Sequence, residues 1–141
     1  MGVKLVTGGA GFIGSSLAEE LLRQGERVRI LDNFATGRRS NLESLPGAVE
    51  LVEGSIVDAA VVAKAMAGVD VVFHQAAIPS VARSVENPPL SLEVNVQGTT
   101  VVLDQARRNG VRRVVFAASS SAYGDTPVLP KVETMEPKPL S

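Results

Sequence analysis

The sequence has 141 residues, a length that suits one domain, and its 45% hydrophobic and 21% charged content is typical of a globular protein. With 14 basic and 15 acidic side chains the net charge is −1, which gives no electrostatic case for a nucleic-acid or anionic-membrane partner. The absence of cysteine excludes disulfides and thiolate metal sites, and a single histidine argues against a histidine-based metal site. No apolar run reaches the roughly 20 residues of a membrane helix, and glycines break the N-terminal run, so we expect a cytoplasmic protein without a signal peptide.

Five short apolar runs alternate with helical patterns along the chain. We expect strands at residues 3–7, 27–32, 48–54, 69–77 and 111–119. We expect helices after the first strand, from Asp58 to about Gly68, and from about Leu90 to Arg108 behind two prolines. The chain after Tyr123 has the proline-rich pattern of a loop. This alternation predicts an α/β fold, a doubly wound parallel sheet of Rossmann type with strand order 3-2-1-4-5.

A glycine-rich turn, TGGAGFIGSS, joins the first expected strand to the first expected helix. Its glycines at positions 8, 11 and 14 form a G-x-x-G-x-x-G pattern. In such a loop the first glycine permits a tight turn, the second lets backbone approach a pyrophosphate, and the third lets the helix pack closely on the sheet. Backbone N–H groups at the helix start attract phosphate, so this loop predicts a dinucleotide site.

The second expected strand ends at Asp32, about 20 residues beyond the glycine loop, where a dinucleotide fold carries an acid. Its carboxylate can accept hydrogen bonds from both hydroxyls of the adenosine ribose. The same negative charge repels a 2′-phosphate, so the sequence favours NAD over NADP. Arg38 and Arg39 could accommodate that phosphate, although a solvated loop is the simpler interpretation of both residues.

Five segments occur in one order: VTGGAGFIGS, LDNFATG, VFHQAA, VNVQGT and SSSAYGD. Together they resemble the extended short-chain dehydrogenase/reductase superfamily, and most of all its NAD-dependent epimerase/dehydratase family of the UDP-glucose 4-epimerase type. The resemblance covers all 141 residues but only the N-terminal part of the family fold. It implies an incomplete NAD-binding Rossmann domain at residues 1–141, without the C-terminal strands and the substrate-binding domain.

The resemblance implies cofactor contacts at positions that match the family motifs. They comprise the pyrophosphate loop, the adenosine-side turn, the adenine-flanking stretch, the end of the fourth strand and one helix residue: Gly8, Gly11, Phe12, Ile13, Gly14, Asp32, Asn33, Thr36, Gly37, Ser55, Ile56, Ala76, Ala77 and Asn95. Ser55 stands where relatives usually carry an acid, so a contact with adenine would use its hydroxyl. Asn95 either braces the cofactor region from behind or bonds only to backbone.

The resemblance places the catalytic Ser or Thr of the family at Ser119, whose hydroxyl would bond the sugar 4-hydroxyl. Ser80, Val81 and Arg83 match the loop that faces the sugar nucleotide. Ser120 and Ser121 stand where dehydratases carry an acid pair, and serines cannot supply the general acid and base of water elimination. This favours a 4-epimerase of UDP-hexoses over a dehydratase or reductase. His74 and Tyr123 are expected to be structural.

The family chemistry also uses a Tyr-x-x-x-Lys pair that follows a PLS segment in relatives. The only tyrosine here, Tyr123, is followed four residues later by Pro127, and the sequence ends at Ser141. We therefore expect the 141-residue chain alone to be inactive, whether it is a truncated enzyme or a natural short protein. The competing interpretation is a non-catalytic dinucleotide-binding module. By resemblance, the complete family member would form a homodimer.

Overall fold

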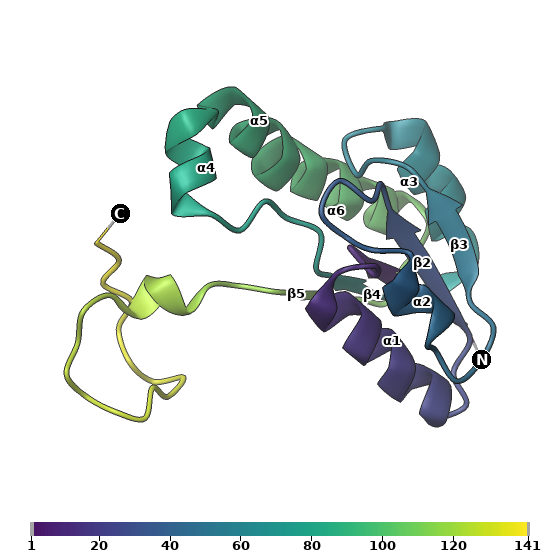
Figure 1. The fold of residues 1–141 in the computed structure, drawn as a ribbon, viewed down its shortest axis with the longest axis horizontal. Coiled ribbons are helices and arrows are strands. Elements are labelled where there is room, and N and C mark those ends of the chain that lie inside the picture. The colour runs from purple at the N-terminus through teal and green to yellow at the C-terminus, as the bar shows by residue number, and fades with distance from the viewer. Residues whose placement is uncertain (1, 141) are drawn as a thin grey trace.

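The computed structural model describes residues 2–140 and contains one five-stranded sheet (Figure 1). The strands are all parallel, and their order is β3-β2-β1-β4-β5. Their bounds are Val3–Thr7 for β1, Val28–Asp32 for β2, Glu50–Glu53 for β3, Val69–His74 for β4 and Arg113–Phe116 for β5. The predicted doubly wound sheet and its strand order are confirmed.

Helices cover both faces of the sheet (Figure 1). On one face α1 (Phe12–Arg23) packs against β1 and β2 through a cluster that includes Ala18 and Leu21. On the other face α3 (Ala59–Met66) and α6 (Thr99–Arg108) enclose the larger cluster, with Val62, Met66 and Val102 fully buried. The central strands are buried from both sides, which explains why they contain almost continuous apolar runs.

Helix termini follow the expected chemistry. The carboxylate of Asp58 caps α3 by accepting hydrogen bonds from the N–H groups of Ala60 and Val61. Gly25 and Gly110, which follow α1 and α6, adopt positive φ angles of 76° and 68°, a conformation that favours glycine.

Several expected boundaries were wrong. The third, fourth and fifth strands are shorter than predicted, and the fourth ends at His74 rather than Ala77. The long helix begins at Pro88 as α5 (Pro88–Leu92), since proline fits the first turn, where no N–H partner is needed. It continues through a π-helical segment, η1 (Glu93–Gly98), before α6. The segment expected to be loop after the fourth strand contains α4 (Val81–Glu86).

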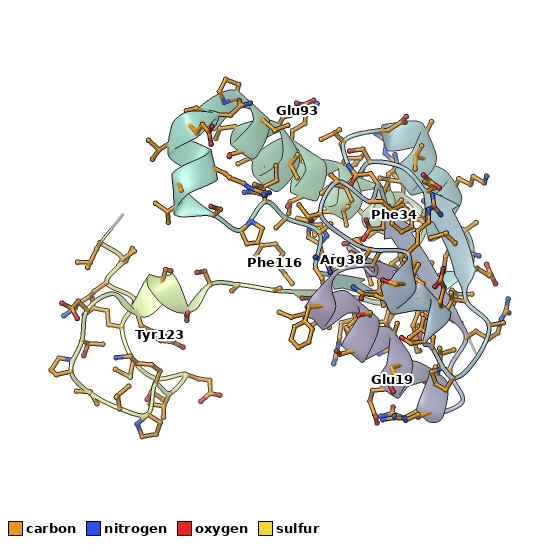
Figure 2. The ribbon with its side chains drawn as sticks, viewed as in Figure 1. Glu19, Phe34, Arg38, Glu93, Phe116 and Tyr123 are labelled. Atoms are coloured by element: carbon orange, nitrogen blue, oxygen red, sulfur yellow. The ribbon has the colours of Figure 1, made fainter. Side chains whose placement is uncertain are left out.

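Two further short helical elements escaped prediction: α2 (Ser40–Glu43) and the 3₁₀ turn η2 (Ser120–Tyr123). Beyond β5 the chain extends away from the sheet, and Tyr123 lies on this projecting part (Figures 1 and 2). None of the side chains from residue 117 to 140 is buried. No helix within residues 2–140 has both the length and the apolar character to cross a membrane.

Candidate functional site

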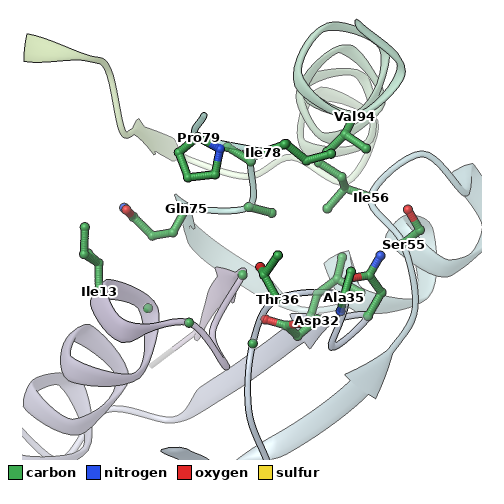
Figure 3. A pocket seen from close by; sticks show the side chains of 18 of the residues that line it. Ile13, Asp32, Ala35, Thr36, Ser55, Ile56, Gln75, Ile78, Pro79 and Val94 are labelled. Carbon is green, nitrogen blue, oxygen red and sulfur yellow. The ribbon is translucent and has the colours of Figure 1, made fainter. Parts of the chain in front are cut away.

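A cleft of about 480 Å³ opens at the carboxyl ends of β1, β2 and β4 (Figure 3). Parallel sheets bind ligands at this edge, where neighbouring connections leave on opposite faces. Every residue predicted to contact the cofactor except Asn95 lines this cleft. The remaining lining residues were not predicted: Leu31, Ala35, Gly54, Gln75, Ile78, Pro79, Leu90 and Val94.

The three glycines of the first turn differ in what surrounds them. Gly8 has a φ of +68°, and a Cβ there would lie 2.8 Å from the backbone of Ala76. A Cβ on Gly14 would collide with the carbonyl oxygen of Gly8, so this glycine allows α1 to pack on the turn. At Gly11 the nearest atom to an added Cβ is the carbonyl oxygen of Gly8 at 3.3 Å, so a methyl group there needs a shift of a few tenths of an ångström, a much smaller conflict than at Gly14.

The N-terminus of α1 is open to the cleft. Its N-cap is Gly11, which has no side chain to cap the first N–H groups of the helix. Phe12 and Ile13, in the first turn, are 85% and 64% exposed, and Ile13 projects at the cleft mouth (Figure 3). The unpaired N–H groups and the helix dipole together make this turn suitable for binding a phosphate.

Asp32, the last residue of β2, stabilises the glycine turn. Its side chain is buried, and its two oxygens accept hydrogen bonds from the N–H groups of Ala10 at 2.9 Å and Phe34 at 2.7 Å. A carboxylate has about four acceptor positions, so each oxygen retains capacity for a ribose hydroxyl. Asp32 therefore shapes the glycine turn and remains able to bind a ligand.

The arginines after Asp32 are not equivalent. Arg39 pairs with Glu53 at 2.6 Å, and its guanidinium stacks 4.1 Å from the centre of the Phe34 ring. Glu53 stands beside Asp32 in the sheet register, so two carboxylates end neighbouring strands here. Arg38 donates its backbone N–H to the carbonyl of Ala10. Neither arginine side chain lines the cleft.

One end of the cleft is formed by the turn after β3. Ser55 lines the cleft, and its hydroxyl oxygen accepts a hydrogen bond from the N–H of Val57 at 3.4 Å. Ile56 is only 5% exposed and packs against Gly98, where a Cβ would lie 2.7 Å from the isoleucine side chain. Small residue size at Gly98 thus allows Ile56 to reach the cleft wall.

The turn after β4 forms the wall opposite α1, and Asn95 supports it from behind. The Asn95 amide oxygen accepts from the N–H of Ile78 at 2.8 Å, and its NH₂ group donates to the carbonyl of Ile78 at 3.2 Å. The bonds that the Asn95 side chain makes to backbone are therefore the same bonds that brace the wall of the cleft. Ala76, on this wall, donates its N–H to the Thr7 hydroxyl at 3.2 Å.

His74 is buried at the end of β4, only 2% exposed, and does not line the cleft. Its ring nitrogens contact the hydroxyls of Thr7 and Thr99. Desolvation lowers the pKa of His74 to about 4, so the ring is neutral at pH 7.

The residues predicted for catalysis and substrate lie outside the cleft lining. The Ser119 hydroxyl accepts from the N–H of Ser121 at 3.2 Å and caps the 3₁₀ turn. Ser80 caps α4 by accepting from the N–H of Arg83. Val81 and Arg83 are exposed on that helix. No cluster of three or more potential metal-ligating side chains occurs among residues 2–140.

Three of the lining residues that the sequence analysis missed share one signal. Gln75, Ile78 and Pro79 directly follow a buried strand at the ligand edge of the sheet, as do the predicted Ala76 and Ala77. Leu90 and Val94 carry no comparable signal, because only the packing of the helix over this turn brings them to the cleft.

The family model for the NAD dependent epimerase/dehydratase family matches residues 4–141. The chain belongs to this family. The UDP-glucose 4-epimerase of Mycolicibacterium smegmatis is 45% identical over 141 aligned residues, which cover 97% of this chain and 45% of that protein. The chain thus spans about half the length of the curated relatives it matches.

Solved structures of family members have the same fold. The UDP-glucose 4-epimerase of Thermus thermophilus, crystallised with NAD, superimposes with a TM-score of 0.85 at 40% identity and covers 97% of this chain and 44% of its own. A dTDP-glucose 4,6-dehydratase from Streptomyces venezuelae, also with NAD bound, gives a TM-score of 0.87 at 36% identity, covering 97% and 45%.

Proposed function

We propose that residues 1–141 form the NAD-binding domain of a nucleotide-sugar 4-epimerase that acts on a UDP-hexose. The observation that carries the proposal is the cleft at the carboxyl edge of the sheet. There the α1 N-terminus, the Gly11 backbone and the Asp32 carboxylate converge. A pyrophosphate and an adjacent ribose require this combination of unpaired N–H donors and a nearby carboxylate.

The charge pattern beside the ribose position supports NAD rather than NADP. Asp32 ends β2 and lines the cleft, so its carboxylate would repel a 2′-phosphate there. Arg39 is engaged by Glu53 and Phe34 and does not line the cleft. Discrimination against NADP is therefore assigned to Asp32.

In this proposal each residue has one task. The N–H groups at the start of α1 bind phosphate oxygens, and Asp32 accepts hydrogen bonds from ribose hydroxyls. Asn95 holds the wall formed by Ile78. NAD, when bound in the cleft, would supply the acceptor and donor of hydride for C4 of the sugar. By family resemblance Ser119 bonds the sugar 4-hydroxyl and helps to move its proton, while Ser80, Val81 and Arg83 face the sugar nucleotide.

Calorimetric titration of NAD⁺ into the chain tests the binding function. We expect binding, and we expect Gly11→Ala to weaken it at least about tenfold because the added methyl group would lie beside the N–H groups at the start of α1. The thermal midpoint of Gly11→Ala, measured alongside, separates a loss of binding from a loss of stability. Failure of the unmutated chain to bind NAD⁺, or tighter binding of NADP⁺, would contradict the proposal.

The epimerase assignment rests on the relatives and on the serine pair. We expect the 141-residue chain alone to turn over no sugar nucleotide, since it contains no Tyr-x-x-x-Lys pair. The intact mass of the native polypeptide separates a longer enzyme from a binding module of 141 residues. For a longer enzyme, chromatography would show a UDP-hexose converted to its 4-epimer, and Ser119→Ala would reduce the rate strongly.

A dehydratase is the second candidate, because a 4,6-dehydratase is among the structural neighbours. Ser120 and Ser121 argue against it, since neither hydroxyl can act as a general acid or base near neutral pH. Formation of a 4-keto-6-deoxy sugar nucleotide instead of a 4-epimer would select the dehydratase. The sedimentation behaviour of the longer polypeptide would test the proposed homodimer.

A further inference from the structure

A chain of side-chain hydrogen bonds crosses the core behind the cleft. The Thr7 hydroxyl, at the end of β1, lies 2.7 Å from Nδ1 of His74, and Nε2 of the same ring lies 3.1 Å from the Thr99 hydroxyl on α6. Thr7 also accepts from the N–H of Ala76 at 3.2 Å. Thr99 donates to the backbone carbonyl of Asn95 at 2.7 Å. These hydrogen bonds thus link β1, the turn after β4 and the long helix.

The outer bonds fix the direction of the inner ones. Because Thr7 Oγ1 accepts from a backbone N–H, its own hydrogen is free to be donated to His74 Nδ1. Because the Thr99 hydrogen is donated to the Asn95 carbonyl, Thr99 Oγ1 accepts from Nε2–H. For a neutral ring, one tautomer satisfies all four bonds, namely the one with its hydrogen on Nε2.

Both ends of this chain hold the same stretch of backbone. At one end, Thr7 binds the N–H of Ala76, which lines the cleft. At the other end, Asn95 grips the N–H and carbonyl of Ile78 through its side chain, and its backbone carbonyl receives the Thr99 bond. The wall of the cleft at residues 76–78 is therefore fixed from two sides through one imidazole ring.

We propose that His74 is a positioning residue which, through Thr7 and Thr99, sets the placement of the cleft wall at residues 76–78. Its effect on cofactor binding rests on the proposed function, whereas its effect on the wall does not. A histidine that merely fills space in the core would keep neither a fixed tautomer nor an influence on the N–H groups of Ala76 and Ile78.

The tautomer can be observed directly because the chain has only one histidine. In ¹⁵N NMR spectra of the histidine-labelled chain near pH 7, we expect one neutral ring with the hydrogen on Nε2 and a bare Nδ1. A ring with the hydrogen on Nδ1, or one that exchanges freely between the two tautomers, would overturn the proposal.

Replacement of Thr99 by valine breaks the link at a residue outside the cleft lining. Thr100 provides a matched control, since its hydroxyl makes the same bond to the carbonyl four residues earlier, at 2.8 Å, and is exposed to solvent. We expect Thr99→Val to accelerate amide hydrogen exchange at Ala76 and Ile78 about two- to tenfold, and Thr100→Val to leave it unchanged. Thr99→Ser, which keeps the hydroxyl, should restore slow exchange and shows whether a folding defect is responsible.

The same three variants are then titrated with NAD⁺. We expect Thr99→Val to weaken binding about two- to tenfold while Thr100→Val and Thr99→Ser bind like the unmutated chain. If the unmutated chain fails to bind NAD⁺, the proposed function falls, and the exchange rates still decide the role of His74. Equal exchange rates at Ala76 and Ile78 in Thr99→Val and Thr100→Val would overturn the positioning role.

Discussion

The body of the molecule, residues 2–116, and the segment from residue 117 to 140 differ in how their side chains are held. In the body, two apolar clusters cover both faces of the sheet, and polar side chains such as Thr7, Asp32 and His74 are buried with partners. In the segment no side chain is buried, and Val128, Leu129 and Leu140 are 58%, 77% and 80% exposed.

The predicted site is divided between the same two regions. All the lining of the cleft belongs to the body, whereas Ser119 lies in the segment. The transition occurs within β5, where Val114 packs against the core but Val115 and Phe116 are 40% and 56% exposed (Figure 2). The cleft thus belongs to a packed scaffold, whereas the residue predicted for catalysis lies outside it. The four predictions below test this contrast.

The largest effect is expected where the helix meets the glycine turn. In Gly14→Ala the new Cβ collides with the Gly8 carbonyl, and because both partners are backbone, neither can move aside easily. We expect a loss of about 3 kcal/mol or more in the free energy of unfolding, measured by urea denaturation. Gly11→Ala serves as the control, and equal stability of the two variants would contradict the packing role of Gly14.

Acidification should weaken the body through His74. The pKa of this residue falls from its ordinary value of 6.5 to about 4 on folding, because burial disfavours the charged ring. Between these pH values the unfolded chain binds a proton that the folded chain does not. The free energy of unfolding therefore decreases as pH falls from about 6.5 to 4, by about 2–3 kcal/mol.

The contribution of His74 to the pH dependence of the free energy of unfolding can be isolated with His74→Gln, because glutamine does not titrate in this range. Urea denaturation of both chains at several pH values between 7 and 4.5 would measure it. We expect the stability difference between the two chains to narrow as pH falls. A constant difference would show that His74 does not carry the acid sensitivity.

A smaller loss of stability is expected at the amino ends of the strands, on the edge of the sheet opposite the cleft. Asp70 in β4 pairs with Lys4 of β1 at 2.9 Å and with Arg112, which leads into β5, at 3.0 Å. Hydrogen bonds from Arg112 and then Lys4 lower the pKa of Asp70 to about 2, so this contribution is present above pH 3.8 and is lost as pH falls toward 2. Asp70→Asn should lower the thermal midpoint at pH 7.

Asp104 offers the matched control for Asp70, because its ion pairs within residues 2–140 are those with Arg107 and Arg108 of its own helix. Exposed pairs within a helix contribute little to stability. Asp104→Asn should therefore shift the midpoint less than Asp70→Asn does. The reverse order would contradict the role of Asp70 in joining three strands.

The smallest effect is expected in the C-terminal segment. A chain that ends at Ala118 loses residues whose side chains, as far as residue 140, are not buried, and it keeps the lining of the cleft. Its thermal midpoint and its NAD⁺ affinity should match those of the unmutated chain within experimental error. A large loss of either property would show that the segment supports the body, and the contrast between the two regions would disappear.

The strand order and most of the cleft could be predicted because they depend on local patterns. Buried parallel strands require apolar runs, and the glycine spacing with Asp32 specifies one kind of turn. The approximate bounds of β1 and β2 and the cap at Asp58 followed from the same patterns.

What escaped prediction depends on packing between distant segments. The π-helical segment changes which side chains face the cleft and brings Val94 to it, and no local pattern marked that change. The link from Thr7 through His74 to Thr99 joins residues from three elements. A single histidine in an apolar run indicates burial, but it does not indicate its partners.

The two N–H bonds accepted by Asp32 have a consequence for how quickly a ligand can be captured. The carboxylate holds Ala10 and Phe34 through bonds made within the chain itself, and Asn41 donates a further bond from its side chain to the Ala10 carbonyl. A turn fixed by its own bonds has little conformational entropy to lose on association, so more of each ligand contact contributes to affinity. We therefore expect NAD⁺ to bind without a slow rearrangement after the first encounter.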